Sequence, residues 1–159
     1  MKIILSFSVF ALVLNLAASP ALTYRDRAGN ISGQASINGS ITTYRDSNGR
    51  IVGTGTRDGS RMVYRDHSGR MTGSASLEGS HVIYRNHSGH IIGIATNLNG
   101  RTTYRDRSGR ITGQAAPEEN QTIYRDHTGQ ITGSSAPASA SGNGIPDDSF
   151  YRVLPTRQK

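Results

Sequence analysis

Residues 42–61 read TTYRDSNGRIVGTGTRDGSR, and the phrase that begins at Tyr44 occurs six times along the chain. Each copy opens with Tyr-Arg-Asp or Tyr-Arg-Asn, runs through two variable residues to Gly, and then reaches Ile or Met and a second Gly. The tyrosines recur every twenty residues, at Tyr24, Tyr44, Tyr64, Tyr84, Tyr104 and Tyr124. A fixed period of this length is typical of repeat architectures, in which each unit packs against its neighbours.

Each copy contains two turn motifs. The first is Asp46-Ser47-Asn48-Gly49, in which the Asp side chain accepts a hydrogen bond from its own backbone and Gly supplies a positive φ. The same spacing recurs at Asp26/Gly29, Asp66/Gly69, Asn86/Gly89, Asp106/Gly109 and Asp126/Gly129. Because Asn86 keeps the turn chemistry without the charge, we interpret these acids as turn residues rather than acid–base catalysts.

The second turn motif is Asp58-Gly59, which predicts a two-residue hairpin loop. It is matched by Asn38-Gly39, Glu78-Gly79 and Asn99-Gly100. In the fifth copy the counterpart is Glu119-Asn120, which follows Pro117, and we expect a looser connection there.

Between the turns the residues alternate as they do in strands. We expect Tyr44 to face the core and Arg45 to face solvent. On the returning strand we place Ile51, Gly53 and Gly55 on the core face with the tyrosine. This taper from large to small side chains indicates strands that converge on a crowded axis.

A two-stranded hairpin cannot bury its own face, so the copies must stack or close around an axis. Closure also removes the exposed sheet edges that invite aggregation. The sequence therefore predicts an all-β fold of tandem 20-residue β-hairpin repeats over residues 22–136, closed around an axis in a flower-like or barrel-like arrangement. An open β-meander is the alternative.

The ends of the chain differ from the repeats. Lys2, the apolar run over residues 3–18 and the small residues Ser19-Pro20-Ala21 predict a secretory signal peptide over residues 1–21, because the run is shorter than the roughly 20 residues of a membrane-spanning anchor. Residues 137–148 are rich in Ser, Ala, Pro and Gly and predict a flexible linker. Residues 149–159 include the apolar stretch SFYRVLP, which could add a strand to the sheet, dock on a protein partner, or remain disordered.

Composition indicates a thin core and a basic surface. After cleavage at Ala21, only 21 of 138 residues are Leu, Ile, Val or Phe, so neighbouring repeats must share their core. The same segment carries 17 basic residues (18 less Lys2) and 11 acidic ones, a net charge of +6. The chain has no Cys, which leaves packing and hydrogen bonds to stabilise it.

The phrase Tyr-x-Asp-x-x-Gly-Arg-Ile-x-Gly, clearest in residues 44–59 and 104–113, resembles the YD repeats of Rhs-type and teneurin-like bacterial proteins. It is even more similar to small exported bacterial repeat proteins with a five-fold β-flower, in which short Asp-x-x-Gly hairpins surround an axis. The resemblance covers residues 22–136. It implies a fold and an exported bacterial protein, but no activity.

The candidate ligand-binding residues are an outer row of basic side chains that each follow a repeat tyrosine: Arg25, Arg45, Arg65, Arg85, Arg105 and Arg125. Arg binds carboxylates, sulfates and phosphates through a planar fork. The alternative is that these residues only decorate the surface and pair with the repeat Asp.

The remaining polar residues point to no catalytic or cofactor site. His67, His87 and His127 occupy turn positions without metal-ligand spacing, and we interpret them as exposed turn residues. No nucleophile–base pair or phosphate loop is present, so we expect neither an enzyme nor a cofactor.

The sequence thus predicts an exported protein, periplasmic or secreted, with no membrane span after cleavage. We expect a non-catalytic binding or structural module for envelope or extracellular glycans or other anionic polymers, with nucleic acid a poorer candidate. The alternative is a protein-interaction component of a surface or secretion assembly that uses residues 149–159.

Overall fold

The computed structural model describes residues 21–136, which form twelve antiparallel strands. The strands are β1 (Ala21–Asp26), β2 (Ile31–Asn38), β3 (Ile41–Asp46), β4 (Ile51–Asp58), β5 (Arg61–Asp66), β6 (Met71–Glu78), β7 (His81–Asn86), β8 (Ile91–Leu98), β9 (Arg101–Asp106), β10 (Ile111–Glu118), β11 (Gln121–Asp126) and β12 (Ile131–Ala136). Within this range no helix is long and apolar enough to cross a membrane.

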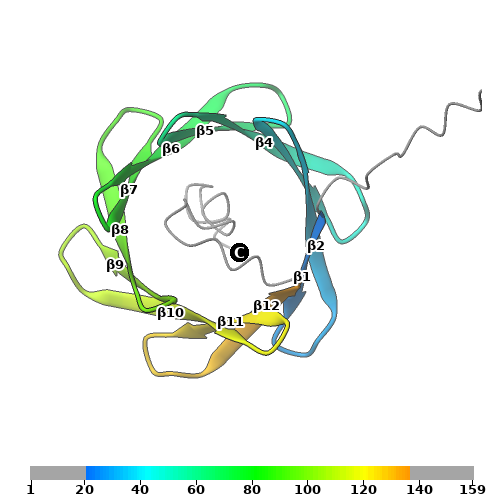
Figure 1. The fold of residues 1–159 in the computed structure, drawn as a ribbon. Coiled ribbons are helices and arrows are strands. Elements are labelled where there is room, and N and C mark those ends of the chain that lie inside the picture. Colours follow the sequence, from blue (N-terminus) through cyan, green and yellow to red (C-terminus); the bar gives the residue numbers. More distant parts are fainter. Residues whose placement is uncertain (1–20, 137–159) are drawn as a thin grey trace, which may run out of the picture.

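The strands follow one another around a closed barrel, and β12 pairs with β1 (Figure 1). The closing seam sets Tyr24 opposite Ser135, just as Tyr44 lies opposite Ala35 between the first two hairpins. All six hairpins therefore meet in one register. The predicted closed arrangement is confirmed, and the open meander is wrong for this chain.

The Asp-x-x-Gly turns have the predicted geometry. The Asp46 Oδ1 atom accepts hydrogen bonds from the backbone N–H groups of Asn48 and Arg50, each at 2.9 Å. The Gly49 N–H donates to the Asp46 carbonyl at 3.0 Å, and Gly49 has a φ of 78°. All six of these turns join the strands of a hairpin at the same end of the barrel, and their tips flare outward from the ring of strands in Figure 1.

The loops at the opposite end lie one residue later than predicted in three places. Asp58 pairs with Arg61, so the two loop residues are Gly59 and Ser60 rather than Asp58 and Gly59. Gly59 has a φ of 56°, which suits a hairpin turn with glycine at its first central position. The loops Gly39-Ser40 and Gly79-Ser80 are alike. The Asn99-Gly100 loop is as predicted, with φ values of 51° and 82°.

The fifth connection is as tight as the others, contrary to expectation. Glu118 pairs with Gln121, which leaves Glu119 and Asn120 as a two-residue loop. Glu119 takes a φ of 54°, close to the values of Gly39, Gly59, Gly79 and Asn99 at the equivalent loop position. The register of the two flanking strands sets the loop length, and Glu119 adopts the left-handed conformation that this length requires.

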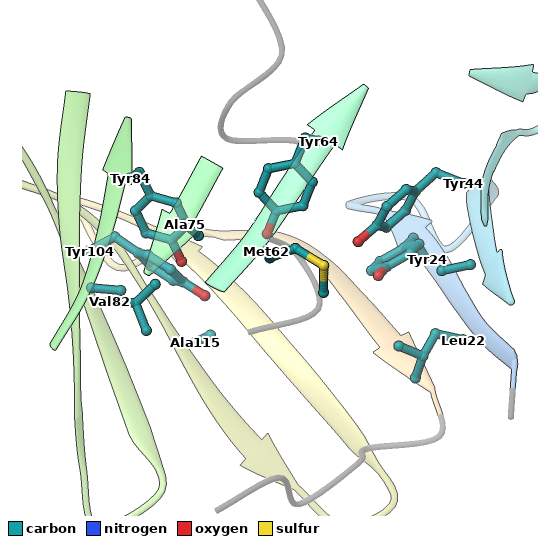
Figure 2. Packing of buried hydrophobic residues seen from close by; sticks show 12 residues of the cluster. Leu22, Tyr24, Tyr44, Met62, Tyr64, Ala75, Val82, Tyr84, Tyr104 and Ala115 are labelled. Carbon is teal, nitrogen blue, oxygen red and sulfur yellow. The ribbon is translucent and has the colours of Figure 1, made fainter. Parts of the chain in front are cut away.

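The tyrosines line the inside of the barrel, as predicted. Tyr64 has 0% of its surface exposed, and Tyr44 and Tyr104 have 1% each. Figure 2 shows these rings with Leu22, Met62 and Val82 in the same cluster of buried side chains.

The placement of Ile51 on the core face is wrong. The ladder pairs Tyr44 with Gly53 but Arg45 with Ile51, so Val52 is an extra residue in a β-bulge. The bulge shifts the alternation by one residue, and Ile51 lies on the outer face beside Arg45 with 47% of its surface exposed. Val52, and not Ile51, packs against the core. The equivalent Ile31, Ile91 and Ile131 are also exposed.

Small residues lie beneath the tyrosine rings. A Cβ atom on Gly55 would lie 3.4 Å from both the Tyr44 ring and the Tyr64 ring. The equivalent positions carry Ala35, Ala75, Ala95, Ala115 and Ser135. Two neighbouring rings therefore cover the small residue at Gly55, and the buried alanines at the equivalent positions belong to the same core cluster.

An arginine row on the outer wall as candidate binding site

The six candidate arginines lie on the outer wall, because each follows a tyrosine that points inward. Arg45 is set between Gln34 on one neighbouring strand and Ile51 on the other. Three of the arginines are exposed and three are half-buried. The common register places all six at one height around the barrel, close to the end that carries the Asp-x-x-Gly turns.

Most of these guanidinium groups are held by the turn that follows them. The Nη1 atom of Arg45 donates to the Gly49 carbonyl at 3.0 Å. Arg25, Arg65, Arg105 and Arg125 make the same bond to Gly29, Gly69, Gly109 and Gly129, at 2.9 to 3.3 Å. A guanidinium carries five N–H donors, and this bond uses one of them. The contact therefore orients the group while using only one of its donors.

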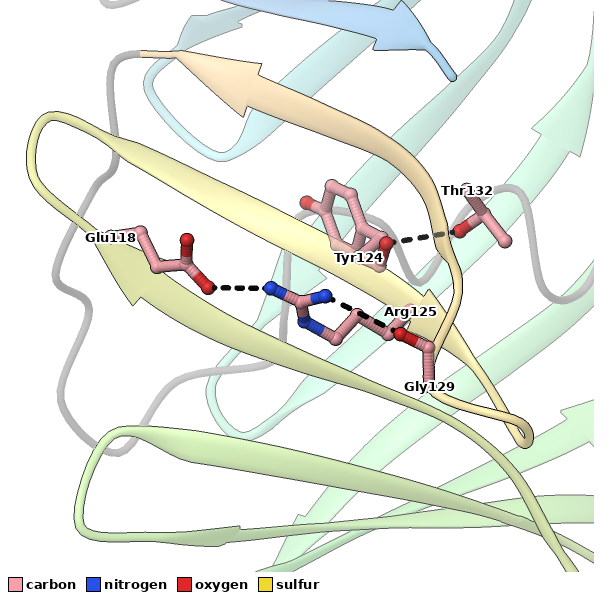
Figure 3. A network of polar contacts seen from close by, with 5 residues as sticks. All are labelled: Glu118, Tyr124, Arg125, Gly129 and Thr132. Atoms are coloured by element: carbon pink, nitrogen blue, oxygen red, sulfur yellow. Dashed lines mark hydrogen bonds and ion pairs between the residues drawn. The ribbon is translucent and has the colours of Figure 1, made fainter.

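Two arginines have acidic neighbours on the adjacent strand. Arg125 lies between Glu118, at 3.1 Å, and the Gly129 carbonyl, as Figure 3 shows. Arg85 lies 3.9 Å from Glu78. Both ion pairs are solvent-accessible, and such pairs are worth about 0–1 kcal/mol, so an incoming anion can compete with them.

The aspartates of the Asp-x-x-Gly turns accept hydrogen bonds within their own turns. The alternative prediction was that they pair with the arginines of the row. A hydrogen bond from the Asn30 side chain is the main cause that lowers the pKa of Asp26. The Ser68 hydroxyl lowers the pKa of Asp66, and the Thr128 hydroxyl lowers the pKa of Asp126. These carboxylates are ionised at neutral pH and serve as turn acceptors.

Further cations share the same end of the barrel. Further exposed arginines lie within the Asp-x-x-Gly turns, at Arg27 and Arg107, or directly after the turn glycine, at Arg50, Arg70 and Arg110. Sequence reasoning did not single them out, because these positions also hold Ser, His, Asn and Gln in other copies. Their common location in turns of known spacing is the signal that could have identified them.

The histidines are distributed over separate elements. His67, His87 and His127 lie exposed in three different turns, while His81 begins β7 and contacts the Thr96 hydroxyl at 3.0 Å. In the part of the chain that the structure describes, no three His, Cys, Asp or Glu side chains form a group that could hold a metal.

Three predicted features lie largely or wholly outside the described residues. They are the signal peptide over residues 1–21, of which only Ala21 is described, as the first residue of β1, and the segments 137–148 and 149–159. In comparisons with known protein families, curated proteins and solved structures, no match to this chain was found.

Proposed function

We propose that this protein is an exported, non-catalytic binding module whose arginine row holds an acidic glycan or another anionic polymer. The observation that carries the proposal is the constant register of Arg25, Arg45, Arg65, Arg85, Arg105 and Arg125 around the outer wall. A polymer with repeated negative charges contacts several such groups at once, and each contact raises the effective concentration for the next.

The rigid attachment of the guanidinium groups supports binding. The bonds to the turn carbonyls hold five of the six side chains in one orientation, at 2.9 to 3.3 Å. Side chains that are ordered before binding lose less conformational entropy when the ligand arrives. A planar donor fork held in this way suits sulfate and carboxylate groups.

The repetition supports a non-catalytic role. Catalysis needs one constellation of differing groups, whereas each hairpin presents nearly the same arginine and turn. The repeat acids accept hydrogen bonds within their turns, as Asp46 does from Asn48 and Arg50, which does not suit them to acid–base work. The predicted signal peptide over residues 1–21 supports an exported location, where envelope and extracellular glycans occur.

The test is a titration of the protein with dextran sulfate, with neutral dextran as the matched polymer control. We expect saturable binding to dextran sulfate only. The variant R45Q/R65Q/R105Q removes three members of the row and should weaken binding at least about tenfold, the equivalent of about 1.4 kcal/mol. The control variant R57Q/R61Q/R101Q removes the same charge at the opposite end of the barrel.

Equal weakening by the two triple variants would mean that net charge alone drives binding, and the arginine row would lose its role. Binding that disappears with modest salt in both variants has the same meaning, because exposed charges are screened within about 10 Å at 0.1 M salt. If dextran sulfate does not bind at all, the proposal fails, and co-purification of a partner that depends on residues 145–159 becomes the next experiment.

A further inference from the structure

The outer wall breaks its own symmetry at one hairpin. Two positions before each arginine of the row, an outward-facing residue of the first strand lies directly opposite a residue of the second. These outer pairs are Thr23–Gln34, Thr43–Thr54, Val63–Ser74, Ile83–Ile94, Thr103–Gln114 and Ile123–Ser134. Only the β7–β8 hairpin is apolar on both sides of the pair. Turn and barrel geometry are the same in all six hairpins, so they do not account for this difference.

The apolar pair forms the floor of a groove. Ile83 and Ile94 line it together with His81 and Thr96, and the turn of the next hairpin, from Arg105 to Gly109, forms a wall. The groove encloses a volume of about 350 Å³ and opens to solvent. It exists because each hairpin turn leans outward past the face of the preceding hairpin, as Figure 1 shows.

The wall of the groove is cationic. Arg105 is oriented by its bond to the Gly109 carbonyl at 2.9 Å, and Arg107 lies exposed two residues further on. The one carboxylate in the lining, Asp106, accepts hydrogen bonds from the backbone N–H groups of Ser108 and Arg110 at 2.8 and 3.0 Å. Its charge is therefore engaged in the turn, while the two guanidinium groups can receive an anion.

We propose that this groove binds a small amphipathic anion, a medium-chain aliphatic carboxylate. The aliphatic chain lies on Ile83 and Ile94, and the carboxylate meets Arg107 and Arg105. The charge of the wall selects an anion, and the apolar floor selects a hydrocarbon chain. Each of the other five outer pairs contains at least one polar side chain. This site shares Arg105 with the arginine row, but polymer binding uses the whole row and does not need the isoleucines.

The experiment is calorimetric titration of the protein with octanoate. The ligand controls are octylamine, which has the same number of carbon atoms and the opposite charge, and acetate, which has the same head group without the long chain. We expect one octanoate per chain with a dissociation constant below about 1 mM. Both controls should bind at least about tenfold more weakly.

Variants locate the site. I83T/I94Q gives the fourth hairpin the Thr and Gln that occupy positions 103 and 114, so the fold tolerates these residues, and octanoate binding should be lost. V63T removes an outer apolar side chain elsewhere and should leave binding unchanged. R107Q should weaken octanoate binding about tenfold, whereas R27Q, in the equivalent turn position, should not.

Three results would overturn the proposal: no octanoate binding by the protein, unchanged binding by I83T/I94Q, or equal binding of octylamine. Sedimentation of the protein without ligand tests the other occupant of an apolar groove, a second copy of the chain. A dimer that I83T/I94Q dissociates would assign the groove to self-association and would also overturn the proposal. Dextran sulfate binding by I83T/I94Q should stay normal, which keeps this test independent of the proposed function.

Discussion

At the scale of single residues, glycine has different roles at two inward-facing positions of the repeat that lie two residues apart. Gly93 occupies a position that is glycine in all six copies, whereas Gly55 occupies one that is alanine or serine in the others. A Cβ atom on Gly93 would lie 2.7 Å from the Arg105 carbonyl oxygen, which the sheet holds in place. A Cβ atom on Gly55 would lie 3.1 Å from the Met62 sulfur, at the flexible end of a side chain. The close approach of two backbones therefore requires glycine only at the first position.

We expect Gly93→Ala to destabilise the protein by about 2 kcal/mol, because the added methyl group must push two strands apart. Gly55→Ala is the matched control and should be neutral or stabilising by up to about 1 kcal/mol, because Met62 can move and the unfolded chain loses freedom. Chemical denaturation followed by far-ultraviolet circular dichroism measures both. The explanation fails if Gly55→Ala is the more damaging change.

Glu119 stands in a conformation that favours glycine, with a φ of 54°. We expect Glu119→Gly to stabilise the protein by about 1 kcal/mol, because a side chain in the left-handed region costs about 1–2 kcal/mol. The reverse change, Gly59→Glu, should destabilise by a similar amount, since Gly59 has a φ of 56° and open space around its Cβ position. Thermal unfolding of both variants tests the pair, and shifts in the same direction would contradict the argument.

At the scale of the element, the Asp-x-x-Gly turn is a small network that orders the end of each hairpin. In the third copy, Asp66 Oδ1 accepts hydrogen bonds from the Ser68 backbone N–H, the Ser68 hydroxyl and the Arg70 backbone N–H. In the fourth copy, Asn86 Oδ1 accepts from the Ser88 and His90 backbone N–H groups at 3.0 Å each. The turn therefore needs an oxygen acceptor and not a negative charge.

The charge gives these turns a pH dependence. The hydrogen bonds led by the Ser68 hydroxyl lower the pKa of Asp66 below its ordinary value of 3.8 in the folded protein. The unfolded chain then binds the proton more tightly, so the stabilisation is complete above about pH 3.8 and is lost as the pH falls through the lower, folded pKa. Asp26 and Asp126 add to this effect in the same direction.

We expect D26N/D66N/D126N to keep the turns and to reduce the acid sensitivity of folding. The free energy of unfolding, measured from pH 7 to pH 2.5, should fall less steeply in the variant than in the unaltered protein. The single variant Asp66→Ala, which removes the acceptor altogether, should be destabilised at every pH in this range. Identical pH profiles for the unaltered protein and the triple Asn variant would show that these carboxylates do not govern the acid response.

The β-bulge in the second strand of each hairpin is another feature at the scale of the element. One extra residue, Val52, separates the pairs Tyr44–Gly53 and Arg45–Ile51. It turns Ile51 outward beside the arginine and brings Val52 against the core. Each hairpin therefore carries a partly apolar outer surface next to its guanidinium group, which simple alternation along the strand does not predict.

At the scale of the whole molecule, closure makes all hairpins equivalent. The seam between β12 and β1 places Arg25 opposite Ser134 and Asp26 opposite Gly133. The junction between β2 and β3 likewise places Arg45 opposite Gln34 and Asp46 opposite Gly33. At the seam, the described end of β12 and the start of β1 lie where residues 37–40 join the corresponding strands β2 and β3, so the position of the break in the ring is arbitrary.

A circular permutant tests this equivalence. Ala136 is joined to Ala21 by four residues that copy residues 37–40, and new ends are opened between Gly79 and Ser80 in the equivalent loop. The permutant should show the same circular dichroism spectrum as the unpermuted chain of residues 21–136. Its free energy of unfolding should lie within about 1 kcal/mol of that reference, because one short loop replaces another.

A second permutant, opened between Val63 and Tyr64 within β5, is the matched control and should be strongly destabilised, because the break interrupts paired backbone. If both permutants lose the β-sheet spectrum, the seam differs from the other junctions in a way that its register does not reveal.

The local features of this protein follow from its sequence. The period predicts the hairpin unit, the Asp-x-x-Gly spacing predicts its turn, and the alternation of Tyr44 and Arg45 predicts which side chain enters the core. These features depend on residues a few positions apart, whose backbone preferences act whatever the rest of the chain does. The arginine row was predictable for the same reason.

The remaining features depend on contacts between hairpins. The outward turn of Ile51 arises from the bulge in the ladder, and the left-handed Glu119 arises from the register of its two strands. The groove over Ile83 and Ile94 exists because the turn of the following hairpin leans across it. A sequence pattern describes what one segment prefers, whereas these features are set by the twist and curvature of a closed sheet, which all twelve strands determine together.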